Sequence, residues 1–452
     1  MTVRTYLSAR RSTTVYDGVT GAVRPFPDAS AGIVLALLLS YLLPARLIFP
    51  PLTTLGRPGV LLGLGLFVWW ALTRLHPVLA TRNRQPMRWA LAGYLGTLAL
   101  SYAAGQARGL PPLEANSTDR TVLMALAGAG ILLAAADGVL TRQRIDTVLR
   151  CLCWCATLMA LVALSQFALR LDLTVYLKLP PVLVFQRDLV GFDDRGGGGL
   201  VRVAGTAGHF IEFSVLMVVG LMVAIHYARF STSRRSRQVY TTLAIVQAGA
   251  VPIALSRTGV LALAAAVGVF VLLWPLRTTL NVLAVGVLLA AVIQVVRPGL
   301  LATLRALLLA GDRDPSVQGR LEDYDVVTPF IRERPWLGRG VGSWLPETYQ
   351  LLDNQWLVSL VTTGLVGVAG LVGLFGTGVV LAGRMVRLAA DRRDRDLAAV
   401  LAVTITVAAT SAFTFDALYF STYLVTIHLL LGLVGALWRV TRADRINQGG
   451  NP

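Results

Sequence analysis

Residues 354–383 read NQWLVSLVTTGLVGVAGLVGLFGTGVVLAG and contain no charged side chain. An α-helix rises 1.5 Å per residue, so about 20 apolar residues cross a hydrocarbon core of about 30 Å. Similar apolar runs recur along the chain, whose 452 residues are 55% hydrophobic and only 14% charged. Ordinary globular proteins carry about 25% charged residues, which cover their surface. The sequence therefore predicts an all-α, polytopic membrane protein.

Twelve of these runs are expected to be transmembrane helices, with boundaries placed by a 19-residue hydropathy window. The predicted spans cover residues 31–49, 58–73, 89–106, 121–140, 147–169, 209–228, 239–256, 258–275, 278–296, 354–383, 397–415 and 418–438. Two connections are long, 170–208 and 297–353, and their Pro and Gly breaks indicate short amphipathic helices and loops. We expect one transmembrane domain over residues 31–440, between tails at residues 1–30 and 441–452.

The distribution of charge predicts the orientation. If the N-terminus is cytoplasmic, the inner segments hold 24 of the 41 basic and 7 of the 24 acidic residues, and thus the whole net charge of +17. This positive-inside pattern places both termini in the cytoplasm and both long connections outside. It explains the basicity without a nucleic-acid partner. Because 40 of the 41 basic residues are arginine, a bias typical of GC-rich genomes, we expect a multi-pass protein of a bacterial cytoplasmic membrane.

Polar residues at the outer helix ends are the candidates for chemistry. Arg257 lies in Ser256-Arg257-Thr258-Gly259, in the short break between two predicted spans. An arginine there costs about 2 to 3 kcal/mol if it faces hydrocarbon. Two interpretations stay open, because its guanidinium can reach a lipid phosphate or bind a diphosphate through two parallel hydrogen bonds.

His209 and Glu212 lie at the start of another predicted span, after Arg202-Val203-Ala204-Gly205-Thr206-Ala207-Gly208. The histidine is either a hydrogen-bonded structural group or a proton-transfer group. The glutamate is either a functional intramembrane carboxylate or the ion-pair partner of Arg202 or Arg257.

Glycines punctuate the second long connection and the span after it. The stretch Gly338-x-Gly340-x-Gly342 follows no predicted strand, so it is not a dinucleotide-binding fingerprint. Small residues then recur every third position, which predicts close helix packing. They are Gly364, Gly367, Gly370, Gly373 and Gly376.

In order, spacing and sidedness, several motifs together resemble the O-antigen ligase/polymerase family over about residues 190–380. They are Arg202-x-x-Gly205 with Gly208-His209, Ser256-Arg257-Thr258-Gly259, Pro335-x-x-Gly338-x-Gly340-x-Gly342, and Asn354-x9-Gly364-x-x-Gly367. The resemblance implies a metal-independent glycosyltransferase without a cofactor, which takes a glycan from a polyprenyl diphosphate on the outer leaflet and joins it to an acceptor hydroxyl. The acceptor is another lipid-linked repeat unit in polymerases, and a lipid core or a protein in ligases. The implied partners are the lipid-linked oligosaccharide and the bilayer, with a chain-length regulator and a flippase as further candidates.

The resemblance also implies roles for residues. Arg257 is expected to stabilise the leaving diphosphate, which is worth about 3 to 4 kcal/mol for a preorganised donor. Further candidates for binding the diphosphate or the glycan are Arg202, Arg320, Arg339 and Asn354.

The motifs leave three candidates for the base that activates the acceptor. Ligases of the family carry a histidine one or two residues before the position of Asn354, where this chain has Leu352 and Asp353. Asp353 is therefore the candidate base, with His209 and Glu212 as alternatives. The missing histidine favours a polymerase over a ligase.

A transporter or flippase of lipid-linked glycans is the alternative from another functional class, because twelve spans with both termini inside suit many carriers. Such carriers are typically built from internal repeats with broken helices near the membrane midplane. The sequence shows no convincing self-similarity, and both long connections are predicted on one side, which favours the enzyme.

Overall fold

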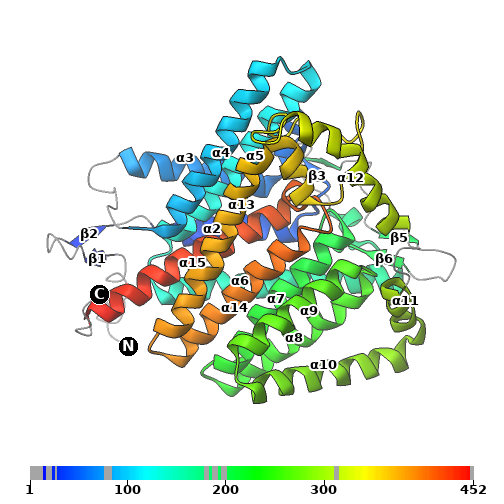
Figure 1. Ribbon diagram of the computed structural model, residues 1–452. Coiled ribbons are helices and arrows are strands. Elements are labelled where there is room, and N and C mark those ends of the chain that lie inside the picture. The colour runs from blue at the N-terminus through cyan, green and yellow to red at the C-terminus, as the bar shows by residue number, and fades with distance from the viewer. Residues whose placement is uncertain are drawn as a thin grey trace.

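A computed structural model describes most of the chain. The described residues are 14–16, 23–25, 28–75, 84–177, 183–185, 192–194, 201–309 and 315–447. They form a bundle of α-helices with a few very short strands (Figure 1). The helices are α2 (Ser30–Leu42), α3 (Pro58–Leu75), α4 (Pro86–Arg108), α5 (Pro112–Gly138), α6 (Arg142–Leu169), α7 (Phe210–Phe230), α8 (Arg234–Ile253), α9 (Arg257–Leu273), α10 (Leu276–Val296), α11 (Pro298–Leu309), α12 (Pro315–Glu333), α13 (Gln355–Leu388), α14 (Arg392–Ser411) and α15 (Ser421–Asn447).

The helices agree with the predicted all-α membrane class. One helix lies in each of the twelve predicted spans, and seven of the described helices are long and apolar enough to cross a membrane. The number of spans and their orientation stay predictions. The first predicted span, 31–49, is too long, because α2 ends at Leu42, two residues before Pro44. Proline lacks a backbone N–H and disfavours helical backbone in the residue before it.

The two long connections differ in structure. Segment 297–353 contains α11 and α12, as expected. The described part of segment 170–208 contains no α-helix, so the expected amphipathic helices are absent there. It forms instead the 3-10 helix η3 (Leu173–Tyr176) and strands β4 (Val184–Phe185), β5 (Phe192–Asp194) and β6 (Val201–Val203). β5 pairs with β6, whereas β4 pairs with β3 (Leu47–Ile48), far away in the chain; a third antiparallel pair joins β1 (Thr14–Tyr16) and β2 (Val23–Pro25).

The centre of the bundle is formed by α7 and α15, whose most apolar windows are 89% and 83% buried. α15 lies against α5, where Gly128 faces His428 and a side chain at Gly432 would collide with the Leu132 carbonyl. Helix α10 instead lies at the outside of the bundle, since only 6% of its apolar window is buried. In Figure 1, α12 and the β5–β6 pair lie at the end of the bundle away from the C-terminal end of α15.

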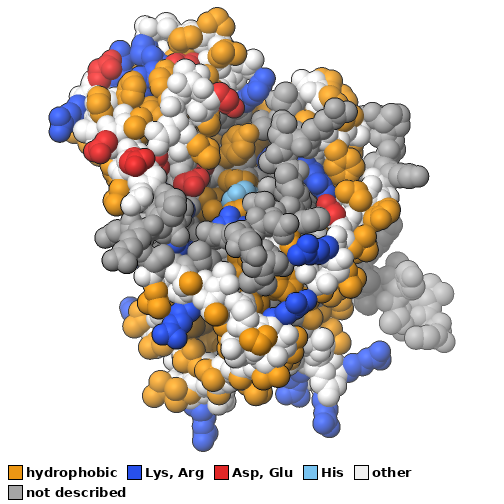
Figure 2. All heavy atoms as spheres, turned by 90° about the vertical axis from the view of Figure 1, so that its right-hand side faces the viewer, with side chains coloured by type: hydrophobic (Ala, Val, Ile, Leu, Met, Phe, Trp, Pro, Cys, Tyr) orange, Lys and Arg blue, Asp and Glu red, His pale blue; other side chains and the backbone are white. Residues whose placement is uncertain are grey.

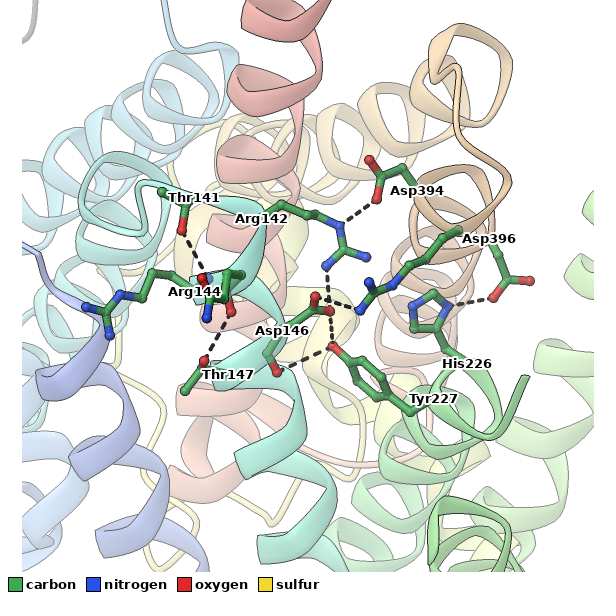
Figure 3. A network of polar contacts seen from close by, with 11 residues as sticks. Thr141, Arg142, Arg144, Asp146, Thr147, His226, Tyr227, Asp394 and Asp396 are labelled. Carbon is green, nitrogen blue, oxygen red and sulfur yellow. Dashed lines mark hydrogen bonds and ion pairs between the residues drawn. The ribbon is translucent and has the colours of Figure 1, made fainter. Parts of the chain in front are cut away.

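Charged side chains close the predicted cytoplasmic end of the bundle (Figure 3). Asp146 on α6 accepts hydrogen bonds from Arg142 at 2.5 Å and from the Tyr227 hydroxyl on α7 at 2.7 Å. Beside them, His226 Nδ1 on α7 lies 2.6 Å from Asp396 Oδ2 on α14. Buried charges are tolerated when they are paired, so this network fixes three helix ends against one another.

Glycine at position 338 allows the connection between α12 and α13 to pack tightly. Gly338 has a φ of 67°, and an added Cβ would lie 2.3 Å from the Thr362 carbonyl. On α13, Gly364 has non-helical dihedral angles, and the N–H groups of Leu365 and Val366 donate to carbonyls of the connection. The close approach explains the glycines without a nucleotide.

The glycine repeat of α13 has only part of its predicted packing role. A Cβ at Gly370 would lie 2.6 Å from Thr97 Oγ1 of α4, which confirms close packing at this position. At Gly373 and Gly376 the prediction is wrong, because nothing lies within 4 Å of an added Cβ.

Candidate active site

The N-terminus of α9 presents Arg257 from a constrained backbone. Ser256 precedes the helix, and Leu255, which is buried, has a φ of 47°. A residue other than glycine in this left-handed region costs on the order of 1 to 2 kcal/mol. The surrounding structure therefore holds the backbone that leads into Arg257, and with it the direction in which the chain enters α9.

The loop 412–420, between α14 and α15, meets both α9 and α12. The hydroxyl of Thr258, next to Arg257, lies 2.8 Å from the hydroxyl of Thr414. Arg320 of α12 donates to the Thr414 carbonyl at 2.9 Å. Arg320 and the N-terminus of α9, where Arg257 lies, are thus brought to one loop.

Helix α13 holds the same loop from a third side. The backbone N–H of Gln355 donates to the carbonyls of Ala412 and Phe415, and its side-chain oxygen accepts from the N–H of Leu418 at 2.8 Å. These bonds span Asp416. The position of its backbone is therefore set by α9, α12 and α13 together.

Three carboxylates lie close to one another around this loop. Asp353 precedes α13, Asp323 lies on α12, and Asp416 lies in the loop. Burial and the neighbouring Asp353 carboxylate raise the pKa of Asp416 to about 7. Burial also raises the pKa of Asp353, against the effect of the nearby Arg320 guanidinium. The pKa of Asp323 is raised by burial and by Asp353, although Gln350 donates to its carboxylate at 2.6 Å.

His209 caps the N-terminus of α7. Its Nδ1 accepts a hydrogen bond from the backbone N–H of Ile211 at 3.3 Å, and its ring lies 5.8 Å from the ring of Phe420. Burial lowers the pKa of His209 to about 4, so the ring is neutral at pH 7. With Nδ1 engaged as an acceptor, the proton lies on Nε2, which then donates and does not accept. This arrangement favours a structural role over that of a base.

Glu212 is fully buried and joins two helix starts. Its carboxylate oxygens accept from the backbone N–H of Gly208 at 2.8 Å and of Tyr423 at 2.9 Å. Arg57, which precedes α3, supplies a positive charge nearby. Glu212 therefore has the contacts of a structural carboxylate that ties α7 to α15.

Three of the candidate binding residues have structural contacts. Asn354 caps α13 by accepting from two backbone N–H groups. Arg339 donates to the Tyr349 hydroxyl at 2.6 Å and lies 3.6 Å from Glu114 of α5. The guanidinium of Arg202 on β6 lies 4.3 Å from the ring centroid of Phe210.

The structure thus brings Arg320, Asp353 and the start of α9, where Arg257 lies, to a loop that contains Asp416. Asp416 was not among the candidates because the predicted spans 397–415 and 418–438 left only residues 416–417 between them, too short a break to indicate a loop. The signal was an acidic residue in the apolar stretch Phe413-Thr414-Phe415-Asp416, since such residues are costly in a membrane and usually functional.

Figure 2 shows the face that lies on the right in Figure 1. This face is hollowed in its middle, and a histidine ring and basic side chains are visible inside the hollow. No group of three or more His, Cys, Asp or Glu in the described part of the chain is arranged to hold a metal ion.

Comparison with known proteins gives one family match. No curated protein matches the chain. Residues 242–372 match the family model described as O-Antigen ligase. The matched segment contains Arg257, Arg320 and Asp353, and it ends before loop 412–420. The chain is therefore a multi-pass membrane protein whose residues 242–372 are similar to the O-antigen ligase family.

Proposed function

We propose that the protein is a glycosyltransferase that moves a glycan from a polyprenyl diphosphate to an acceptor hydroxyl, on the outer face of a bacterial cytoplasmic membrane. The observation that carries this proposal is that Arg320 and Thr258, the neighbour of Arg257, both contact loop 412–420, where the Asp353 carboxylate lies near that of Asp416. Arginines suit a diphosphate, and a carboxylate with a pKa near 7 suits a base.

In the proposed reaction, Asp416 acts on the acceptor and the two arginines act on the leaving group. The acceptor hydroxyl oxygen attacks the anomeric carbon of the donor glycan, and its proton passes to the Asp416 carboxylate. The bond between the anomeric carbon and the diphosphate oxygen breaks, and the polyprenyl diphosphate leaves with the electron pair. Arg257 and Arg320 neutralise the negative charge that develops on this leaving group. Because arginines perform this task, no metal ion is required.

Among the reactions of the family, we favour polymerisation of lipid-linked repeat units for an O-antigen-like or exocellular polysaccharide. The family resemblance places a histidine of the ligases where this chain has Leu352 and Asp353. A ligase that moves the glycan to a lipid or protein acceptor is the second candidate, and it uses the same donor site.

The test uses purified protein in lipid nanodiscs with the lipid-linked repeat unit of the producing bacterium as the single substrate. Chains of two or more repeats on the lipid, detected by mass spectrometry, are expected for a polymerase. Product formed only after addition of a separate acceptor would identify a ligase. Movement of the lipid across a vesicle membrane without a new glycosidic bond would overturn the proposed function in favour of a flippase.

Metal independence is tested in a separate experiment. We expect the rate of chain extension to be unchanged after dialysis against a chelator. Complete loss of activity that a divalent cation restores would contradict neutralisation of the leaving group by arginine alone.

A further inference from the structure

Loop 412–420 exposes two aromatic rings although most of its backbone is fixed by polar contacts. Phe413 is 55% exposed and Tyr419 is 52% exposed. Phe413 lies against another aromatic ring, since its centroid is 5.5 Å from that of Trp356. Tyr419 instead lies at the end of the 3-10 helix η5 (Ala417–Tyr419), which begins directly after Asp416.

The geometry of η5 places Tyr419 one turn after Asp416. The N–H of Tyr419 donates to the Asp416 carbonyl at 3.3 Å, which closes one 3-10 turn. Because a 3-10 helix has three residues per turn, this bond keeps the backbone of Tyr419 close to that of Asp416.

Arg57 packs against Tyr419 and supports its ring. This arginine is 5% exposed, it donates to the Tyr419 carbonyl at 3.4 Å, and its guanidinium lies 6.0 Å from the ring centroid. Phe420 meets the ring edge to face, at 6.0 Å and 87°. Arg57 is held in turn by its charge interaction with the buried Glu212. A half-exposed ring thus sits on a rigid, buried support.

A rigid tyrosine of this kind fits a sugar. A sugar ring has apolar C–H faces and a rim of hydroxyl groups, and tyrosine has an apolar ring face with one polar end. Tyrosine also contributes contact area at a low cost in conformational entropy. A sugar stacked on Tyr419 would lie at the loop that contains Asp416, three residues before the ring.

We propose that Tyr419 is the stacking platform for the acceptor sugar, and that Arg57 is the positioning residue that orients this ring. The inference rests on the proposed function, because it assigns the acceptor to the side of the site that contains Asp416. The acceptor class is a saccharide, here the terminal sugar of a second lipid-linked repeat unit.

The first test measures binding of a soluble probe, namely the oligosaccharide released by mild acid from the lipid-linked repeat unit. Saturation-transfer NMR with the full-length protein in nanodiscs gives its dissociation constant. We expect Tyr419→Leu to weaken binding about tenfold, the size of one aromatic contact, and Tyr419→Phe to change it less than threefold. The matched control Phe413→Leu, in the same loop and equally exposed, is expected to bind like wild type. Wild-type affinity in Tyr419→Leu, or absence of binding to the wild-type protein, would overturn the proposal.

The second test needs no variant and is therefore independent of folding defects. Tetranitromethane nitrates exposed tyrosines, and peptide mass spectrometry reports each site separately. The oligosaccharide is expected to protect Tyr419 and to leave Tyr324 of α12, which is 50% exposed, unprotected. Equal nitration of Tyr419 with and without the oligosaccharide would exclude stacking on this ring.

The positioning role of Arg57 is tested by measuring KM for the acceptor and kcat separately. Arg57→Lys keeps the charge beside Glu212 but loses the planar group under the ring, so we expect a higher KM for the acceptor with an unchanged kcat. A fall in kcat alone would contradict positioning. Binding that depends on Tyr419 without any chain extension would refute the proposed function alone, whereas extension with binding that ignores Tyr419 would refute this inference alone.

Discussion

Asp416 links the pH of the medium to the rate of the proposed reaction. Its pKa of about 7 means that the carboxylate is half protonated at neutral pH, and only the ionised form accepts a proton. We expect kcat/KM to rise as the pH increases through about 7 and to level off above it. Asp416→Asn is expected to lower kcat/KM by about 10² to 10⁴-fold and to abolish this rise. Initial rates across this pH range check the prediction, and an unchanged profile would remove Asp416 as the base.

Asp353 is expected to act on the same profile through its charge. Its negative charge raises the pKa of Asp416, so Asp353→Asn lowers that pKa and moves the midpoint of the pH profile to lower pH. Turnover above the midpoint is expected to stay close to that of wild type. If Asp353→Asn instead loses as much activity as Asp416→Asn, Asp353 itself is the base.

The arginines are tested by truncation with a matched control. Arg257→Ala and Arg320→Ala are expected to lower kcat by about 10² to 10³-fold, because each removes a donor to the leaving diphosphate. Arg332→Ala, an exposed arginine of α12, is expected to leave kcat within twofold of wild type. Size-exclusion profiles establish that each variant is folded, and wild-type turnover in Arg257→Ala would refute its assignment.

For single residues, the sequence predicted which residue types serve the reaction better than it predicted what each side chain contacts. Arg257, Arg320 and Asp353 were candidates from the family resemblance, and the structure brings Arg320, Asp353 and the start of α9, where Arg257 lies, to one loop. Asn354 and Glu212 were also candidates, yet both accept backbone hydrogen bonds at helix starts. Hydropathy and motif order cannot distinguish a carboxylate that binds substrate from one that binds a neighbouring helix, because the difference lies in long-range contacts.

Among the elements, α13 and the connection before it allow a prediction about stability. Gly338→Ala places a methyl group 2.3 Å from the Thr362 carbonyl at a φ of 67°, so the substitution strains the backbone and separates the connection from α13. We expect a loss of at least about 2 kcal/mol. Gly376→Ala, with open space around the added Cβ, is expected to stabilise the protein by about 0.5 to 1 kcal/mol. Thermal unfolding in nanodiscs orders the variants, and equal melting temperatures would contradict the close approach.

Helices were predicted well because each is encoded by its own apolar run. The failures have a different origin. The strands of segment 170–208 were missed because two or three residues are too few to show a period of alternating side chains, and β4 in addition pairs with β3, more than a hundred residues away. Loop 412–420 was missed because its apolar residues extend the hydropathy of α14 and α15 on both sides.

For the whole molecule, the orientation in the membrane is the prediction that most needs a measurement. After replacement of the three native cysteines by alanine, single cysteines are introduced by Thr232→Cys, between α7 and α8, and by Glu347→Cys, before α13. Both positions are exposed. In intact spheroplasts, a membrane-impermeant maleimide is expected to label Glu347→Cys and to spare Thr232→Cys. The reverse pattern would invert the topology and place loop 412–420 in the cytoplasm.

The central position of α15 has a consequence for biosynthesis. α15 follows every other described helix in the chain, so it leaves the ribosome after all of them. The surfaces of α2 and α5 that it covers, including Tyr41 and Gly128, then have no protein partner while the earlier helices are inserted. Their burial must wait for α15 to leave the translocon. Assembly of the core is therefore post-insertional, and a nascent chain stalled before α15 presents an unfilled groove to lipids, chaperones and membrane proteases.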